Sequence, residues 1–366
     1  MAHSRTLSAE ETEAFGRELD ALRNRHIAEL GERDARYIRR VRASVRISEL
    51  AGRLMLFAGF FPPTWIAGVL LLAFSKIVDN MELGHNVMHG QYDFMNDPEF
   101  SGKTFEWDHS CTSDAWRHTH NYQHHTYTNV LGKDHDIGYG TVRVFPEQRW
   151  RAFYLLQPLW ALLQAVLFEY AIAIFDLKLD RYFKGKVSKA ELQAKLPAVK
   201  RKLWRKFIKD YVFFPLLAGP NFLGVLAGNA LANLLRNLWT FAVIFCGHFT
   251  EHAEVFPASV LKNESRGAWY VRQLRGSSNL SGSWLLHFMT GNLSHQIEHH
   301  LFPDLPARRY ASMAVEVKAI CQRYGQHYNT GSFAGQFFTV LVRIFRHAFP
   351  SKPARQAALQ PAQANV

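Results

Sequence analysis

Three long stretches of this chain contain almost no charged residues. Residues 54–75 have none, residues 152–175 have only Glu169, and residues 211–250 have only Arg236. Because about 20 apolar residues cross a bilayer, this pattern indicates an all-α membrane protein. The mean hydropathy of the whole chain is only -0.16, so much of its mass must lie outside the bilayer. A membrane enzyme with large polar parts therefore fits better than a channel.

Turn residues divide two of these stretches into helical hairpins. Pro62-Pro63 interrupts the first, and the third can turn at Gly219-Pro220-Asn221 or at Gly228-Asn229. We therefore predict transmembrane hairpins at about 46–80 and about 211–248. The first predicted helix contains three charged residues, Arg46, Glu49 and Arg53. Because they weaken its apolar character, one kinked crossing is the alternative to the first hairpin.

The basic residues predict which side of the membrane each segment faces. Residues 176–210 hold 12 Lys or Arg against 4 Asp or Glu, and a run of arginines precedes residue 54. Cytoplasmic loops carry such an excess, so both hairpins should begin and end in the cytoplasm. Residues 152–175 then form an interfacial helix rather than a crossing. The expected location is the cytoplasmic membrane, with the active site facing the cytoplasm.

The two ends of the chain lack apolar spans. Residues 1–45 show no signal-peptide pattern, and Ser8 with Glu11 predicts a capping box that opens an amphipathic cytosolic helix. Residues 46–350 would form one membrane domain, followed by a disordered Ala/Gln/Pro-rich tail at 351–366. Three scattered cysteines exclude a disulfide framework. The net charge of +12 favours a lipid surface or another acidic partner, and no nucleic-acid partner is expected.

Fourteen of the 18 histidines lie in two windows of the chain. Within these windows, pairs stand at i and i+4, a spacing that points two imidazoles to the same side of a helix. The residues with this spacing, together with the neighbours beside them, are His85, His89, His120, His124, His125, His295, Gln296, His299 and His300.

This supply of imidazoles predicts a metal centre. Neutral imidazoles bind iron, copper and zinc, and no cysteine accompanies them. One zinc takes three or four ligands, whereas at least seven histidines are available here, with His248 and His252 in addition. Two metals with open positions for oxygen suit this number. Both windows must meet on one side of the bilayer, so an even number of crossings must separate His125 from His299, which agrees with the interfacial placement of residues 152–175.

Three segments carry a resemblance to a known family. They are GHNVMHGQYDFMND (84–97), WRHTHNYQHHTYTN (116–129) and NLSHQIEHHLFPDLP (292–306). Their order, with the hydrophobic pairs between them, resembles the membrane fatty acid desaturases over roughly residues 50–330. The resemblance implies two transmembrane hairpins, four helices in all, under a cytosolic helical cap that holds a di-iron centre. It also implies the removal of two hydrogens from an acyl chain, with O2 as co-substrate and two electrons from a donor.

The resemblance further implies the ligands of two iron ions. His248 is similar to the ligand at the end of the family's fourth helix, and His252 one turn later is the alternative. The third motif has Gln296 where animal-type stearoyl-CoA enzymes have His, so His295 is a candidate ligand and contact between Gln296 and iron is left open. The other expected ligands are His85, His89, His120, His124, His125, His299 and His300. Acidic neighbours that can orient the ligand rings are Glu82, Asp134, Asp136 and Glu298.

By the same resemblance, the expected reaction introduces a cis double bond into a C16–C18 acyl-CoA at the ninth carbon. One alternative is a front-end or other acyl-lipid desaturase, because Gln296 stands where front-end enzymes also have glutamine. Another is a membrane fatty acyl hydroxylase. A zinc-dependent membrane hydrolase is the alternative from a different class, although HExxH is absent. Apart from the membrane lipid and the acyl substrate, we expect a separate electron donor of the ferredoxin, flavin/iron–sulfur reductase or cytochrome b5 type. The acyl chain should lie in an apolar tunnel with Trp107, Trp116 and Trp284 as candidate lining residues.

Overall fold

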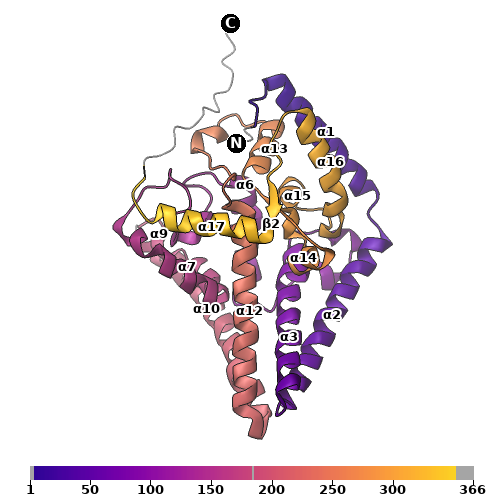
Figure 1. The fold of residues 1–366 in the computed structure, drawn as a ribbon, viewed down its shortest axis with the longest axis vertical. Helices are drawn as coiled ribbons and strands as arrows, with labels where there is room; N and C mark the ends of the chain where they lie inside the picture. The colour runs from indigo at the N-terminus through magenta and orange to yellow at the C-terminus, as the bar shows by residue number, and fades with distance from the viewer. Residues whose placement is uncertain (1–3, 184, 352–366) are drawn as a thin grey trace.

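The computed structural model describes residues 4–183 and 185–351. Long helices form a tapering bundle in one half of the molecule, and shorter helices form a cap over it (Figure 1). The predicted helical character is confirmed. The described strands are short: β1 (Asn279–Ser281) and β2 (Thr330–Ser332) pair in parallel within the cap.

The first hairpin consists of α2 (Glu32–Phe57) and α3 (Pro62–Val78). Pro62 occupies the first turn of α3. Backbone N–H groups in the first turn make no hydrogen bond within the helix, so proline, which has no N–H, is tolerated there. Glycines let the two backbones approach closely. A Cβ atom at Gly68 would lie 2.9 Å from the Leu56 amide nitrogen, and one at Gly52 would lie 2.8 Å from the Leu72 amide nitrogen. This close contact is typical of helices that pack in membranes through small residues.

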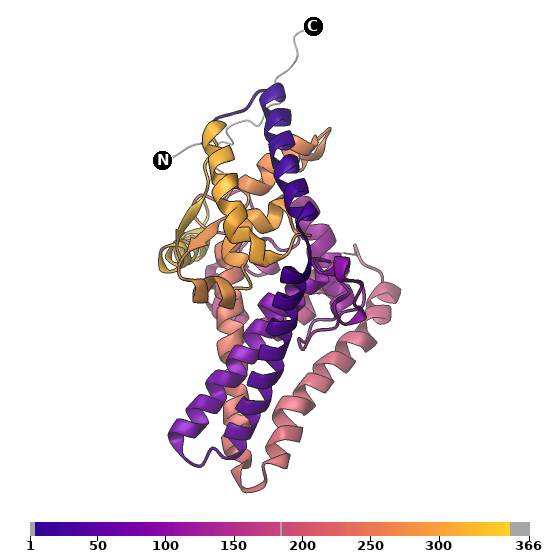
Figure 2. The ribbon, with the colours of Figure 1, turned by 90° about the vertical axis from the view of Figure 1, so that its right-hand side faces the viewer.

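The second hairpin is longer than the sequence predicts. Its first arm runs from α10 (Lys189–Phe207) through a π-helical turn (Ile208–Phe213) into α11 (Phe214–Leu217), and its second arm is α12 (Phe222–His248). The chain reverses at Gly219–Asn221, the first of the two predicted turns. Figure 2 shows that both hairpins turn at the same end of the molecule.

The early start of the second hairpin has a physical cause. Much of the basic run at 176–210 lies on α10, where Lys206 is only 4% exposed and pairs with Asp108 at 2.7 Å. Such pairing stabilises the charged face of α10 against the protein, and the helix begins at Lys189 because the Ser188 side chain accepts from the Glu191 N–H as an N-cap.

Length and composition identify few helices that can cross a membrane. Within the described ranges, one continuous segment is long and apolar enough, Gly219–His248. A second passes only if Ala152–Val166 and Phe168–Phe175, bent by 102°, count as one span. The helix α3 has 17 residues, and α2 carries charged side chains along its length.

Further helices surround the upper part of the bundle. The helices α7 (Gln157–Val166) and α8 (Phe168–Phe175) meet at a bend, so the predicted interfacial helix at 152–175 is two helices rather than one. The helix α9 (Leu179–Phe183) follows them, and α17 (Phe333–His347) lies across α12 (Figure 1).

The cap contains the N-terminal helix and the short helices that follow the hairpins. The predicted capping box is confirmed, because Ser8 and Glu11 cap each other's backbone N–H groups at the start of α1 (Ala9–Ala28). The apolar stripe of α1 packs inside the cap with Tyr270 and Tyr310. The other cap helices are α4 (His85–Met88), α5 (Ser113–Trp116), α6 (His125–Tyr127), α13 (Arg266–Arg275), α14 (Trp284–Met289), α15 (Gln296–Leu301) and α16 (Tyr310–Arg323).

The helix boundaries differ from the predicted domain limits. The helix α2 continues from Glu32 to Phe57 across the predicted limit at residue 45. Apart from Ser351, the predicted tail at 351–366 lies outside the described residues.

The glycine contact between α2 and α3 makes a testable prediction. Gly68→Ala places a methyl group against the α2 backbone, so we expect a lower thermal denaturation midpoint in detergent. Gly31→Ala is the matched control, because a Cβ atom there meets nothing within 4 Å. Equal midpoints for the two variants would contradict the close packing of the hairpin.

Candidate metal centre

Four segments that are far apart in the sequence bring their histidines together where the cap meets the bundle. Their ligand nitrogen atoms form groups in which all atoms lie within 4.8 Å of one another. The first histidine group consists of His85, His89, His120 and His299. The second histidine group consists of His124, His248 and His300.

His125 connects the two groups. Its ring centroid lies 4.7 Å from that of His299 in the first group and 4.3 Å from that of His300 in the second. The ligand atoms of these three residues also form a compact set. The whole arrangement therefore offers two adjacent sites with a ring between them.

Local helix geometry aims several of these rings. His120 and His124 belong to a π-helical segment, Arg117–His124, and His85 follows directly after another, Asp79–Gly84. Short π-helical turns occur frequently at functional sites. Here the His120 and His124 rings stack with centroids 5.2 Å apart and an angle of 23° between their planes.

The Nδ1 atoms of several ligand candidates are held by hydrogen-bond acceptors. His124 Nδ1 donates to the Asp134 carboxylate at 3.0 Å, and His248 Nδ1 donates to the Gly276 carbonyl at 3.0 Å. His300 Nδ1 donates to the Gln273 amide oxygen at 2.9 Å. An acceptor at Nδ1 keeps the proton there and leaves the lone pair on Nε2.

The Nε2 atoms face one another without protein partners that satisfy them. In the described part of the chain, the buried Nε2 atoms of His89, His125, His299 and His300 have no hydrogen-bond partner. His124 Nε2 and His248 Nε2 approach to 3.2 Å. Buried polar atoms are rarely left unpaired, so a cluster of free imidazole lone pairs fits the donor set of bound metal ions.

Burial keeps most of these rings neutral. It lowers the pKa of His89, His125 and His299 well below the ordinary value. His124 differs: burial lowers its pKa, but the charge and hydrogen bond of Asp134 outweigh burial, and the net pKa is raised. Neutral imidazole is the form that binds metal.

Two sequence candidates lie away from the two groups. The His295 ring stacks on His287 with centroids 4.7 Å apart, and His295 joins no candidate metal group among the described residues. His252 is exposed and lies against His327, so His248 rather than its alternative joins the site. We therefore leave His295 and His252 out of the proposed ligand set.

Gln296 reaches the second histidine group. Its amide nitrogen lies 2.9 Å from His248 Nε2. A Cβ atom at Gly247 would lie 3.0 Å from the Gln296 amide carbon, so the glycine beside His248 makes room for this side chain.

The acidic neighbours divide into two kinds. Asp134 holds the His124 ring, and Asp136 lies 3.7 Å from His120 Nδ1. Glu82 instead bonds Tyr37 and Asn292, while Glu298 bonds Asn279 and Tyr328 and lies 4.0 Å from His295. Glu82 and Glu298 therefore tie cap segments together rather than orient ligand rings.

Sequence reasoning did not identify the other groups that hold the rings. Gln273 and Gly276 come from α13 and its C-terminus, and Tyr310 begins α16, where its hydroxyl lies 3.4 Å from His299 Nδ1. None of them stands near a histidine motif in the sequence, so no local spacing marks them. Asn86, adjacent to His85 and bonded to its Nδ1 at 3.0 Å, is the exception that a local pattern could have found.

A mostly apolar cavity leads to the histidine groups. Its lining includes His120, His124 and His248 together with Phe168, Ile172 and Ile244. Trp107 and Trp116 also line it, as predicted. Trp284 does not, because it is 74% exposed at the start of α14.

An open groove continues from this cavity to the surface. Trp107, His109 and Asp176 line both spaces. The far wall of the groove belongs to α10 and the turn after it, and its basic residues are Lys195, Arg201, Lys202, Arg205, Lys206 and Lys209. Glu106, Asp108, Asp114 and Asp176 line the groove as well, so six basic residues stand against four acidic ones and the net positive charge favours an anionic group.

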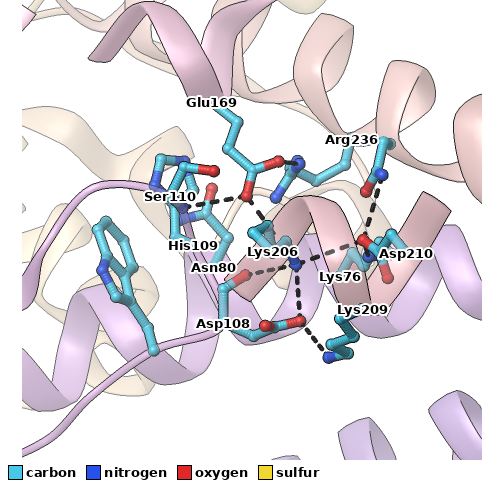
Figure 3. Close-up of polar contacts among 12 residues, drawn as sticks. Lys76, Asn80, Asp108, His109, Ser110, Glu169, Lys206, Lys209, Asp210 and Arg236 are labelled. Atoms are coloured by element: carbon cyan, nitrogen blue, oxygen red, sulfur yellow. Dashed lines mark hydrogen bonds and ion pairs between the residues drawn. The ribbon is translucent and has the colours of Figure 1, made fainter. Parts of the chain in front are cut away.

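A network of buried charges lies beneath the cavity (Figure 3). Glu169 and Arg236, the single charged residues of two apolar stretches, pair with each other on α8 and α12. Asp210 pairs with Lys76 of α3 at 2.7 Å and lies 3.7 Å from Lys206. Each buried ion thus has a partner of opposite charge, as low-dielectric surroundings require.

The same network holds the segment that carries Trp107 and His109. Lys206 and Lys209 contact the Asp108 carboxylate at 2.7 and 2.8 Å. The Ser110 N–H donates to Glu169 at 3.0 Å. Charges on α8, on α10 and in the turn after α10 therefore hold the segment that carries two lining residues of the cavity, Trp107 and His109.

Comparisons with known proteins agree with this site. A family model described as "Fatty acid desaturase" matches residues 63–332. The chain belongs to the fatty acid desaturase family. The match includes every residue of both histidine groups and of the network, so the cavity and its histidines are features of a desaturase.

Several curated desaturases are similar to the chain. It is 44% identical over 356 residues to a protein of Mycobacterium tuberculosis named "NADPH-dependent stearoyl-CoA 9-desaturase". The aligned region covers 96% of this chain and 83% of that protein. It is 29% identical to the "sn-1 linoleoyl-lipid 6-desaturase" of a Synechocystis species, over 76% of this chain and 79% of the relative. Human "Fatty acid desaturase 3" is 25% identical over 63% of this chain and 48% of its own length.

The buried pair of Glu169 and Arg236 makes a second prediction. Glu169→Gln leaves the Arg236 guanidinium buried without a counter-charge, which typically costs about 3–5 kcal/mol. We expect a clearly lower denaturation midpoint in detergent than for the unaltered protein. Asp114→Asn is the control, because the Asp114 side chain is 96% exposed in its pair with Arg117. A Glu169→Gln variant as stable as this control would contradict the role of the pair.

Proposed function

We propose that this desaturase uses O2 to introduce a cis double bond at the ninth carbon of a C16–C18 acyl-CoA. The observation that carries the proposal is the apolar cavity that ends at two groups of histidines with free lone pairs. The 44% identity to a relative named as a stearoyl-CoA 9-desaturase, over 96% of the chain, supports the choice of substrate and position.

The proposed cofactor is a pair of iron ions. One ion would be held by His85, His89, His120 and His299, and the other by His124, His248 and His300. His125 lies against both sites and can complete either. The all-nitrogen donor set and the unpaired Nε2 atoms fit this cofactor.

The iron centre would supply, with O2, the oxidising power needed to remove hydrogen from an unactivated methylene. The residues of this chain perform the positioning. Phe168, Ile172 and Ile244 would confine the alkyl chain and exclude water, and the ligand rings of His120, His124 and His248 line the same cavity. Binding in a narrow channel presents one pair of carbons to the metals, and this positioning decides where the double bond forms.

The thioester-linked headgroup would occupy the open groove. Coenzyme A carries several phosphates, and the α10 wall offers Lys195, Arg201 and Arg205 beside the lysines already paired with Asp108 and Glu106. Arg and Lys side chains bind phosphate through charge and hydrogen bonds.

We also propose the membrane placement expected from the sequence. The two hairpins would cross the cytoplasmic membrane, and the cap with both histidine groups would face the cytoplasm. The buried pairing of Arg53, Lys76 and Arg236 supports this placement, because it removes charge from helix surfaces that would contact lipid.

The electrons would come from a separate protein. The mycobacterial relative is named as NADPH-dependent, and NADPH delivers electron pairs that a flavin or iron–sulfur protein passes on singly. A reductase of the flavin/iron–sulfur type is therefore our first choice, ahead of a ferredoxin or a cytochrome b5.

One alternative has support of its own. The Synechocystis relative is named "sn-1 linoleoyl-lipid 6-desaturase". The glutamine at position 296 is, by the resemblance noted in the sequence, similar to the third motif of front-end desaturases. A double bond nearer the carboxyl end would then be the product. The family match sets aside the zinc-dependent hydrolase considered from the sequence.

The third prediction concerns the product. A host that expresses this chain with a matching reductase should accumulate C16 and C18 acids with a cis double bond at the ninth carbon. Gas chromatography–mass spectrometry with double-bond localisation measures this, with His299→Ala as the inactive control. A double bond at the sixth carbon would favour the acyl-lipid alternative, and a hydroxylated acid would contradict desaturation.

The fourth prediction separates ligands from neighbouring histidines. His248→Ala should lose bound iron, and turnover should fall by at least about 100-fold, since even an outer partner of a ligand is worth about 10–100-fold. His252→Ala is the matched control four residues away and should retain both. Iron content measured by elemental analysis tests this directly. Iron loss in His252→Ala but not in His248→Ala would overturn the assignment.

A further inference from the structure

The helix α17 has two sides with clearly different surroundings. Val340 and Ile344 are buried against α12 and α7, and the Gln157 side chain of α7 donates to the Ile344 carbonyl. This contact attaches α17 across the upper part of α12 (Figure 1).

A polar stripe of α17 faces the cap. The Arg343 guanidinium donates to the Glu251 carbonyl at 2.7 Å and to the Ala253 carbonyl at 3.3 Å. Thr339, one turn before Arg343, accepts from the Glu251 N–H at 3.3 Å. Residues 251–253 follow the end of α12 and belong to the cap, so these contacts define the cap side of the helix.

An exposed apolar stripe lies on the other side of the helix. Phe338 is 66% exposed, Leu341 36% and Phe345 59%. These residues are spaced at i, i+3 and i+7, so they share one face. Helical geometry turns this face away from Thr339 and Arg343. The stripe therefore points away from the cap, toward the bundle end of the molecule.

The apolar stripe continues onto a neighbouring helix. On α7, which packs beside α17, Leu159 is 48% exposed, Leu162 57% and Leu163 43%. The exposed Arg149 and Arg151 lie close to the end of α17, because Trp150 between them donates to the Ala348 carbonyl at 2.8 Å. Apolar side chains beside arginines match the acyl and phosphate layers of an anionic lipid surface.

We propose that α17 lies in the cytoplasmic interface of the bilayer and binds anionic lipid. The Phe338, Leu341 and Phe345 side chains enter the acyl layer, and Arg149 and Arg151 contact lipid phosphates. The inference rests on the membrane placement proposed above but not on the metal centre or the substrate. A helix that lies parallel to the membrane in this way fixes the distance of the cap from the lipid surface. It thereby also fixes the position of the cavity relative to the lipid.

The test measures how deep α17 lies in lipid. Phe338→Cys and Phe345→Cys are labelled with a nitroxide, with Arg346→Cys as the control on the polar side of the same helix and Leu70→Cys as the reference within the first hairpin. The native cysteines, Cys111, Cys246 and Cys321, are buried, and labelled unaltered protein gives their background. Proteins are placed in nanodiscs that contain phosphatidylglycerol and phosphatidylcholine.

Power-saturation electron paramagnetic resonance compares collisions with oxygen, which enriches in lipid, and with a water-soluble nickel chelate. We expect oxygen-to-nickel ratios at 338 and 345 to exceed the ratio at 346 by about threefold or more, since interfacial helices bury one face about 5–10 Å deep.

Other outcomes overturn the proposal in distinguishable ways. If 338 and 345 are as open to nickel as 346 while Leu70→Cys is shielded, α17 does not contact lipid although the hairpins do. If Leu70→Cys is open to nickel, the membrane placement itself fails. Dipolar broadening at 345 that vanishes on dilution with unlabelled protein would show that a second copy covers this face instead.

Discussion

The buried ion pairs beneath the cavity impose the constraint on which the rest of the structure depends. Removing an ion from water costs several kcal/mol, so a carboxylate or cation inside an apolar bundle must meet its partner. Glu169 therefore requires Arg236, and Asp210 requires Lys76. These two requirements bring α8, α12, α3 and the end of α10 to one place. Arg53 of α2 also pairs with Asp210, and the close glycine contact between α2 and α3 completes the bundle.

The ion network also connects the bundle to the chemistry. The segment with Trp107 and His109 is held at Asp108 by two lysines and at Ser110 by Glu169, so the walls of the cavity are positioned from below. The histidine groups are positioned from the other side by acceptors in the cap, such as Gln273 at His300. The cavity therefore lies between two independently rigid supports, which suits an enzyme that must select one pair of carbons along an otherwise uniform chain.

The sequence predicted the chemically active side chains better than their supports. Histidine spacing identified every residue of the two groups except His248, because i and i+4 positions share a helix face wherever the helix lies; the family resemblance supplied His248. It also suggested His295, whose motif position is equivalent but whose ring turns toward His287. The direction of a ring at the start of a short helix depends on tertiary contacts, and no spacing rule supplies them. The sequence did not indicate Gln273 and Tyr310 for the same reason, since they approach His300 and His299 only in the folded protein.

By itself, the sequence determined the helical character, the turn at Pro62, the histidine motifs and the family, and it limited the second turn to Gly219 or Gly228. These features depend on local conformational preferences and on the pattern of apolar residues, and both can be read from neighbouring positions in the sequence. Tertiary structure decided that α10 forms part of the second hairpin, because Lys206 near its C-terminal end is stabilised by Asp108 from another segment, whereas Ser188 marks its start locally. It also decided that α17 turns an apolar face away from the cap. Partners that are distant along the chain become neighbours only in the folded molecule, and the energy of burying a charge or an aromatic ring depends on which neighbour it finds.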